Sequence, residues 1–307
     1  MYQRINAFDI GGFNIKVVSG QVTMKRIDVS SASVFPTPEG LVVDGLITEP
    51  QVLAEYLRGE LSQIKRFSKE IIATVTSKAI IIRDINVPKV NSLEFTRMMR
   101  HEAIENLPVT LDDHIIDYKI IEEVNGENGA EYRVMLVAIP RNIVSSYLEF
   151  LRAIGMDCKG IDFAGNSVSK LIVRQDAKEK FKKTTAVLDL GHTSSAVTIM
   201  HRGAFKYYRI FSHGVGELSL EFETLDKLLE EIKTFFDFYM SRESGNTIDK
   251  ITILGGGALI EGVIPYIEQK LLIPINLWQT RGVVRLSREA RMGDNIVQFA
   301  NAIGALR

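Results

Sequence analysis

The chain has 307 residues and a formal net charge of −1 at pH 7. A chain so close to neutrality has no overall field that would draw it to DNA, RNA or anionic lipid, which excludes binding to such partners by general charge. Apolar residues make up 46% and charged residues 24%, the proportions of a folded globular protein, and the length allows two domains with separate cores.

Cys158 is the only cysteine, which rules out an internal disulfide and suits a reducing compartment. No uninterrupted apolar run reaches the ~20 residues of a membrane span, and no apolar core of a signal peptide precedes Asp9. We therefore expect a cytoplasmic protein whose contact with a membrane depends on a partner.

The first elements are two apolar strands around an Asp-x-Gly turn. Residues 5–10 and 14–18 are expected to be strands, and Asp9 and Gly11 lie where the first strand ends. Glycine lets the backbone turn tightly and point N–H donors at an anion, while an aspartate at a strand end can hold a cation or its water. The unit indicates a phosphate site, although a single copy is also typical of a plain β-hairpin.

The following segments predict an α/β layer. Thr48 can cap a helix, because Gln51 follows three residues later and Pro50 falls in the first turn, where no amide partner is needed. The apolar residues after Pro50 recur at helical spacing up to residue 64. Strands are expected at residues 24–35, 71–75 and 79–87.

A small inserted subdomain is expected from about residue 89 to residue 137. A helix at residues 91–108, opened by Asn91 and stopped by Pro108, precedes strands at 115–122 and 132–139. One helix and two strands between α/β elements suggest an insertion. A further helix begins at residues 140–142 and ends at Gly155.

The second half repeats the plan of the first half. Strands are expected at residues 185–190, 194–200 and 204–211, followed by a long helix at 218–242. Asp189 and Gly191 repeat the Asp-x-Gly turn, 180 residues after Asp9. Two such turns facing each other would form a clamp that closes on polyphosphate from both sides.

Three glycines form the last notable element. Gly255, Gly256 and Gly257 follow a strand at residues 250–254, and a closing helix is expected at 294–306. Glycines in that place let a flat group lie close to the backbone, although a simple strand-to-helix turn explains them as well. The spacing of the dinucleotide fingerprint and of the Gly-Lys-Ser/Thr phosphate loop is absent from the sequence.

These three elements, in this order, resemble those of the actin, heat-shock-chaperone and sugar-kinase superfamily. Within it the chain resembles the PilM family, the actin-like proteins of type IV pilus assembly that are related to the division protein FtsA. The resemblance covers nearly the whole chain, and no single motif would carry it alone. The matching stretches are residues 9–11 with Lys16, 44–47, 138–144, 236–239, 254–258 with Gly262, and 301–306.

The resemblance implies an actin-like α/β fold of two ribonuclease-H-like domains flanking a nucleotide cleft, at residues 1–159 and 160–307. The first domain would carry the FtsA/PilM-type inserted subdomain at about 89–137. The insertion usual in the second domain would be reduced, because the chain passes almost directly from Gly216 into the helix expected at Leu218.

The resemblance also implies a site for ATP and Mg²⁺. Mg²⁺ would be oriented through water by Asp9 and Asp189, and the adenosine would lie beside Gly255, Gly256 and Gly257. The phosphates would be faced by residues of both turns and by one lysine, namely Gly11, Gly12, Asn14, Lys16, Gly191, Thr193 and Ser194.

Several positions depart from the family pattern in ways that bear on hydrolysis. Gly12 and Phe13 stand where relatives usually carry hydroxyl residues, and Ala196 stands where many carry an aspartate. The acidic residue expected before the second turn is Asp162, unless a shift of two residues places Ala164 there, which cannot position a water. We therefore expect nucleotide binding with weak or absent hydrolysis, and Asp162 is the candidate catalytic residue.

The implied function is a non-enzymatic scaffold of type IV pilus assembly. The chain is expected to bind the N-terminal cytoplasmic tail of a PilN-like membrane protein, in a groove between the first domain and the inserted subdomain. Met98 and Met99, on the helix at residues 91–107, would line this groove or belong to the core. This partner would place the protein at the inner face of the cytoplasmic membrane, and self-association stays open.

Two alternatives remain at this point. One is an active ATPase whose hydrolysis resets the assembly. The other is an FtsA-like division protein that polymerises on the membrane, which the sequence disfavours because it ends at Arg307 without an amphipathic anchor after the closing helix.

Overall fold

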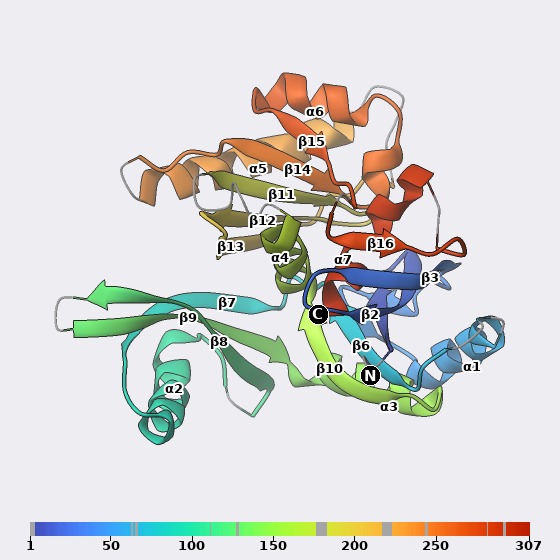
Figure 1. The fold of residues 1–307 in the computed structure, drawn as a ribbon, viewed down its shortest axis with the longest axis horizontal. Coiled ribbons are helices and arrows are strands. Elements are labelled where there is room, and N and C mark those ends of the chain that lie inside the picture. Colours follow the sequence, from blue (N-terminus) through green and yellow to red (C-terminus); the bar gives the residue numbers. More distant parts are fainter. Residues whose placement is uncertain are drawn as a thin grey trace.

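The protein is built from two central β-sheets, a smaller three-stranded sheet, and helices between and around them (Figure 1). The structure, a computed structural model, describes residues 4–62, 64, 67–110, 112–126, 129–175, 183–216, 223–242, 245–280, 282–290 and 293–307. None of the helices in these ranges is long and apolar enough to cross a membrane.

The first central sheet consists of β1 (Ile5–Ile10), β2 (Asn14–Val22), β3 (Ile27–Pro36), β6 (Glu70–Val75), β10 (Asp157–Phe163) and β16 (Val284–Leu286). Its strand order is β10-β6-β1-β2-β3-β16. The first three strands pair antiparallel in succession, while β6 runs parallel to β1 and β10 runs parallel to β6. The central strand β1 is almost wholly buried, which explains its apolar sequence.

The second central sheet repeats this design. It consists of β11 (Thr184–Leu190), β12 (Ser195–His201), β13 (Ala204–Phe211), β14 (Lys250–Leu254) and β15 (Ile275–Leu277), in the order β13-β12-β11-β14-β15. The strand directions match those of the first sheet, and so does the register: Asp9 pairs with Lys16, and Asp189 pairs with Ala196. The two Asp-x-Gly segments are therefore structural equivalents.

Two helices, α4 (Ala164–Gln175) and α7 (Ala300–Ala305), pack between the central sheets (Figure 1). They cross where Gly304 meets the backbone of Ser167, so closely that a Cβ at residue 304 would overlap the Ser167 carbonyl. α7 also packs against β1 and β6, and β16 pairs with β3. The last residues of the chain thus return to the first sheet.

The outer helices cover the far sides of the two central sheets. α1 (Pro50–Leu61) and α3 (Arg141–Ala153) pack against each other beside the first sheet, and a short ribbon of β4 (Val42–Val43) and β5 (Leu46–Ile47) lies next to α3. α5 (Glu223–Arg242) and α6 (Val263–Leu271) pack together beside the second sheet. The expected start of α5 at Leu218, and with it the reduced insertion, lies outside the described residues.

Two local predictions are wrong. Thr48 does not cap α1: its hydroxyl donates to the Gly40 carbonyl at 2.8 Å, and Glu49 occupies the N-cap without a side-chain hydrogen bond. The closing helix is not continuous, because residues Gly293–Phe299 form a 3-10 segment (η2) before α7 begins.

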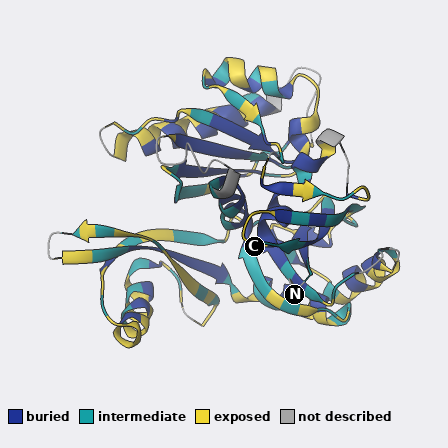
Figure 2. Cartoon of the chain, in the orientation of Figure 1, coloured by how far each residue is buried: buried dark blue, intermediate teal, exposed yellow. Residues whose placement is uncertain are grey.

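The smaller sheet consists of β7 (Ile81–Pro88), β8 (His114–Gly126) and β9 (Gly129–Pro140) in the order β7-β9-β8, with α2 (Ser92–Asn106) packed on it. Asn91 caps α2 as predicted, because its side chain accepts from the Glu94 amide at 3.1 Å. This unit has a small core of its own, and Figure 2 shows that much of its remaining surface is exposed. β7 pairs with β9, so the sheet begins before residue 89; the domain boundaries themselves remain a prediction.

Candidate functional site

The first candidate phosphate loop is the turn between β1 and β2. The Gly11 amide donates to the Asn14 carbonyl at 3.1 Å, which closes the turn. Thr37 braces the loop from β3's end, because its hydroxyl donates to the Gly11 carbonyl at 2.6 Å and its amide donates to the Phe13 carbonyl at 2.9 Å. Thr37 therefore holds the loop at the carbonyls of Gly11 and Phe13.

The second candidate loop is the turn between β11 and β12. A Cβ on Gly191 would overlap the Ser194 carbonyl, so this turn requires glycine at its first position. The segment after β13 braces the loop: the Val215 amide donates to the Gly191 carbonyl at 2.9 Å, and the Gly216 amide donates to the His192 carbonyl at 2.8 Å.

The two loops meet across the gap between the halves of the protein. The rings of Phe13 and His192 stack, with centroids 3.6 Å apart and planes 3° from parallel. A Cβ on Gly12 would lie 3.8 Å from Thr193 Oγ1. In the repeat, Gly12 corresponds to His192 and Phe13 corresponds to Thr193. The contacts Phe13–His192 and Gly12–Thr193 are therefore equivalent, as expected when two copies of a unit are related by a two-fold axis.

Unused donors line both loops. Among the residues that the structure describes, no protein acceptor takes a hydrogen bond from the amides of Gly12, Phe13, His192 or Thr193. Free amides in consecutive turn residues make an anion-binding concavity. Both loops can therefore present backbone N–H groups to an anion held between the two halves.

A charged network lies directly beside the loops. Lys16 Nζ lies 3.3 Å from Asp9 Oδ2, and the Thr74 hydroxyl lies 3.2 Å from Asp9 Oδ1. Asn301 on α7 donates from Nδ2 to Asp189 Oδ2 at 2.8 Å. Asp9 is only 5% exposed and Asp189 is half-buried, so protein partners replace the solvation that these carboxylates lose.

Burial and neighbouring charges shift the pKa values of Asp189 and Lys16. Burial raises the pKa of Asp189 and the nearby Asp9 charge raises it further, while Asn301 and Lys16 act in the opposite direction. Burial alone would lower the pKa of Lys16, but the carboxylates of Asp9 and Asp189 raise it above its ordinary value. Lys16 is therefore charged, and the two carboxylates share it.

The donor set fits Mg²⁺ bound together with phosphate better than a metal held by protein alone. Across the described ranges, no group of three or more His, Cys, Asp or Glu residues could hold a metal ion. Mg²⁺ usually takes one or two carboxylates and completes its shell with water and phosphate oxygens. Asn301 Oδ1 and the Tyr147 hydroxyl are buried near these carboxylates without a partner in the described part, so polar capacity remains for water.

The three consecutive glycines do not have the same role. Gly255 has φ +91°, and a Cβ there would collide with the Asp189 carboxylate and the Leu190 carbonyl. A Cβ on Gly257 would crowd the side chains of Leu190 and Val215, whereas one on Gly256 would meet nothing within 4 Å. Packing against the second loop therefore explains two of the glycines, and Gly256 is the one that faces open space.

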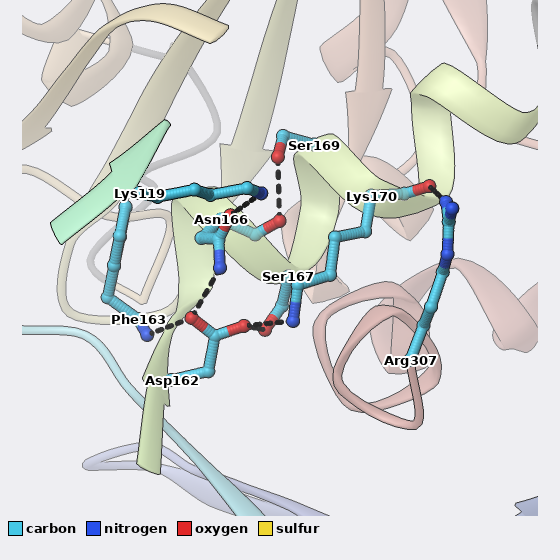
Figure 3. Close-up of polar contacts among 8 residues, drawn as sticks. All are labelled: Lys119, Asp162, Phe163, Asn166, Ser167, Ser169, Lys170 and Arg307. Atoms are coloured by element: carbon cyan, nitrogen blue, oxygen red, sulfur yellow. Dashed lines mark hydrogen bonds and ion pairs between the residues drawn. The ribbon is translucent and has the colours of Figure 1, made fainter. Parts of the chain in front are cut away.

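Asp162 lies on β10 in line with the network. It is paired with Thr74 on the neighbouring strand β6, and Thr74 is paired with Asp9 on β1. Two strand spacings therefore separate Asp162 from Asp9, a distance of roughly 10 Å. Its carboxylate is fully engaged (Figure 3). It accepts from the Phe163 amide at 2.9 Å and, each at 2.8 Å, from Asn166 Nδ2, Ser167 Oγ and Lys170 Nζ. This geometry fastens the start of α4, and it leaves little free acceptor capacity for a water.

A second candidate site is a groove of about 350 Å³ at the junction of the smaller sheet, α2 and the start of α3. Most of its lining is apolar, and Ile115 and Tyr118 on β8 are each 37% exposed. Arg141, the first residue of α3, also lines the groove, and its Nε donates to the Asp112 carbonyl at 2.8 Å. The lining residues are Thr96, Met99, Arg100, Ala103, His114, Ile115, Ile116, Tyr118, Leu136 and Arg141.

Comparison with known proteins identifies the family. Residues 7–224, more than half of the chain, match the family described as type IV pilus assembly protein PilM. The chain belongs to the PilM family. The family resemblance and the actin-like fold class predicted from the sequence are thereby confirmed.

Solved structures agree on the fold of this PilM family member. A PilM-PilN type IV pilus biogenesis complex matches with a TM-score of 0.83 at 20% identity, over 98% of this chain and 97% of the other. The ethanolamine utilization protein EutJ from Carboxydothermus hydrogenoformans matches with a TM-score of 0.55 at 10% identity, over 99% and 89%. A Bacteroides thetaiotaomicron protein with an actin-like ATPase fold matches with a TM-score of 0.51 at 10% identity, over 97% and 95%.

Some residues of the candidate site escaped the reasoning from sequence. Asn301 holds the Asp189 carboxylate from α7, and no local pattern links two residues so far apart in the chain. Phe13 stood out only as a departure from the family pattern, and its partner His192 could not be foreseen. The predicted loop residues of the two halves, in contrast, do lie together.

Proposed function

We propose that this chain is a cytoplasmic scaffold of type IV pilus assembly that binds the N-terminal cytoplasmic tail of a PilN-like membrane protein. Membership of the PilM family supports the process, and the likeness to the PilM-PilN complex extends over 98% of the chain. The partner would hold the protein at the inner face of the cytoplasmic membrane.

The groove between α2, the smaller sheet and the start of α3 carries this proposal. Its apolar lining suits the side chains of an extended peptide. Met99 forms the floor of the lining as a buried core residue, 2% exposed, and Met98 packs against the same core. His114 also lines the groove and adds a polar group beside the apolar side chains. Arg100 lines the same groove and adds a positive charge for an acidic residue.

Calorimetric titration with a synthetic PilN-like tail peptide tests the peptide site. Replacing Ile115 by Asp puts a charge into the groove lining, and we expect peptide affinity to fall at least about tenfold, because an anchor in an apolar groove typically contributes more than 1.4 kcal/mol. Ile104, on α2, is 54% exposed and does not line the groove, so Ile104→Asp is the matched control. Equal affinity of both variants and the wild type would refute this groove.

We further propose that ATP and Mg²⁺ bind in the cleft between the halves. The free amides of the two loops and Lys16 would hold the phosphates, Asp9 and Asp189 would orient Mg²⁺ through water, and Gly256 would border the adenosine. Mg²⁺ would supply charge neutralisation for the phosphates. The engaged carboxylate of Asp162 supports binding without efficient hydrolysis.

An active ATPase is the competing function, and phosphate release with Mg-ATP separates the two. We expect wild-type release no faster than that of Asp189→Ala, together with ATP binding in the wild type that this variant loses. Wild-type turnover well above the variant would establish the ATPase instead.

A further inference from the structure

We propose that the Phe13–His192 stack is a latch across the mouth of the cleft, and that a nucleotide enters or leaves only when this stack opens. The inference rests on the proposed nucleotide site. In this proposal Phe13 and His192 control the rate of nucleotide exchange, although neither side chain is needed to form the turns or the hydrophobic core.

Phe13 has no structural reason to be aromatic. Its side chain is 50% exposed and does not belong to either hydrophobic core. The turn itself is closed by the backbone of Gly11 and Asn14, which places no demand on the residue at position 13. The equivalent position in the second loop is the small residue Thr193. The half-exposed phenyl ring stacks on the ring of His192 in the other loop.

The backbone on both sides of the stack is held in place by contacts with neighbouring segments. On the first loop, Thr37 fixes the carbonyl on each side of Gly12. On the second loop, the Gly216 amide binds the His192 carbonyl, and the His192 ring packs so closely on Gly216 that no Cβ fits there. If the halves separate at this point, the stack is the contact that must break.

The stacked rings belong to the loops that directly follow Asp9 and Asp189 in the chain. Phe13 and His192 are exposed, whereas Asp9, near the end of β1, is 5% exposed. The four free amides lie on the same residues that form the closure, Gly12 and Phe13 on one side and His192 and Thr193 on the other. A polyphosphate held between these amides needs the two loops to part, because the loops contact each other through the stacked rings and between Gly12 and Thr193.

Nucleotide exchange tests the latch directly. A fluorescent ATP analogue with Mg²⁺ is bound and then chased with excess ATP, and its dissociation rate is measured by stopped flow. We expect Phe13→Ala and His192→Ala each to raise this rate about fivefold, the factor that follows from losing one stacked aromatic pair. The double variant should be no faster than either single one, and Phe13→Trp should keep the wild-type rate.

Phe238→Ala is the matched control, because Phe238 is 43% exposed on α5 and its ring contacts Tyr207 away from the cleft. It should leave the exchange rate unchanged. Unchanged rates in Phe13→Ala and His192→Ala, while the analogue binds, would overturn the latch. So would two single effects that simply add in the double variant.

A measurement without nucleotide separates failure of the latch from failure of the proposed site. Amide hydrogen exchange at the hydrogen-bonded amides that close and brace the loops, those of Gly11, Thr37, Val215 and Gly216, should be about fivefold faster in ligand-free Phe13→Ala than in the wild type or in Phe238→Ala. If no variant binds the analogue but this acceleration appears, the closure stands and the nucleotide site falls. If the loop amides exchange equally in all three proteins, the latch is refuted.

Discussion

At the scale of single residues, the buried environment of the Asp189 carboxylate disfavours its negative charge. Burial raises its pKa, so the folded protein binds a proton on Asp189 more tightly than the unfolded chain does. Stability therefore falls as the pH rises from the unfolded value of about 3.9 through the folded pKa, and it stays lower above that range. The same carboxylate is the one that Mg²⁺ would neutralise.

Asp189→Asn removes this charge and keeps an oxygen that can accept from Asn301. We expect a higher melting temperature than in the wild type at pH 7, with a difference that shrinks as the pH is lowered toward 4. Thermal unfolding of both proteins across this pH range measures the effect. A lower melting temperature of the variant at pH 7 would show that attraction to Lys16 outweighs burial.

A second conservative change tests whether Asp162 has a structural or a catalytic role. Asp162→Asn keeps the volume but weakens the bond to Lys170, and we expect a loss of about 1–2 kcal/mol in urea unfolding, as for a charge-assisted hydrogen bond. Any basal phosphate release should stay the same. A general base would instead lose about 10²–10⁴-fold in rate, with stability unaffected.

At the scale of elements, the two halves are joined by the crossing of α4 and α7. The backbone contact between Gly304 and Ser167 lets these helices approach far more closely than two ordinary side chains would allow. The atoms that face Gly304 are backbone atoms within α4, so they cannot rotate away. Any side chain larger than the hydrogen of Gly304 would therefore push α4 and α7 apart and change the spacing of the central sheets.

Gly304→Ala should destabilise the protein by about 2 kcal/mol or more, because it overpacks this crossing. Gly59→Ala is the matched control. Gly59 is exposed on α1 and a Cβ there would meet nothing within 4 Å, so the higher helix propensity of alanine should stabilise the protein by about 0.5–1 kcal/mol. Urea unfolding gives both values. Shifts of the same sign in both variants would mean that helix propensity, rather than the crossing, determines the result.

At the scale of the whole molecule, Arg133 connects the smaller sheet to the second central sheet. It lies on β9, is 5% exposed, and binds Asp84 on β7 at 2.7 Å and Glu122 on β8. It also donates to the Phe205 carbonyl on β13. The unit that carries the proposed peptide groove is therefore tied to the half that carries the second loop.

Arg133→Ala should cost about 2–3 kcal/mol in urea unfolding. This is less than the 3–5 kcal/mol for breaking a fully buried pair, because the side chains of Asp84 and Glu122 are 31% and 42% exposed. Arg133→Lys should restore only part of the loss, since an ammonium cannot reach three acceptors in a planar fork. Arg83, exposed on β7, provides the control, and Arg83→Ala should stay within about 0.5 kcal/mol of the wild type.

The sequence by itself determined the repeated strand–turn–strand units, most helices and strands, and the family. These features depend on short periods of apolar residues and on glycines in tight turns, which are encoded locally. Only the tertiary structure decided that β7 joins the smaller sheet, that β16 and α7 return to the first half, and that Asn301 holds Asp189. It also decided that Phe13 meets His192 and that Asp162 is surrounded by partners. Such pairings follow from how whole faces pack against each other, and no local pattern records that arrangement.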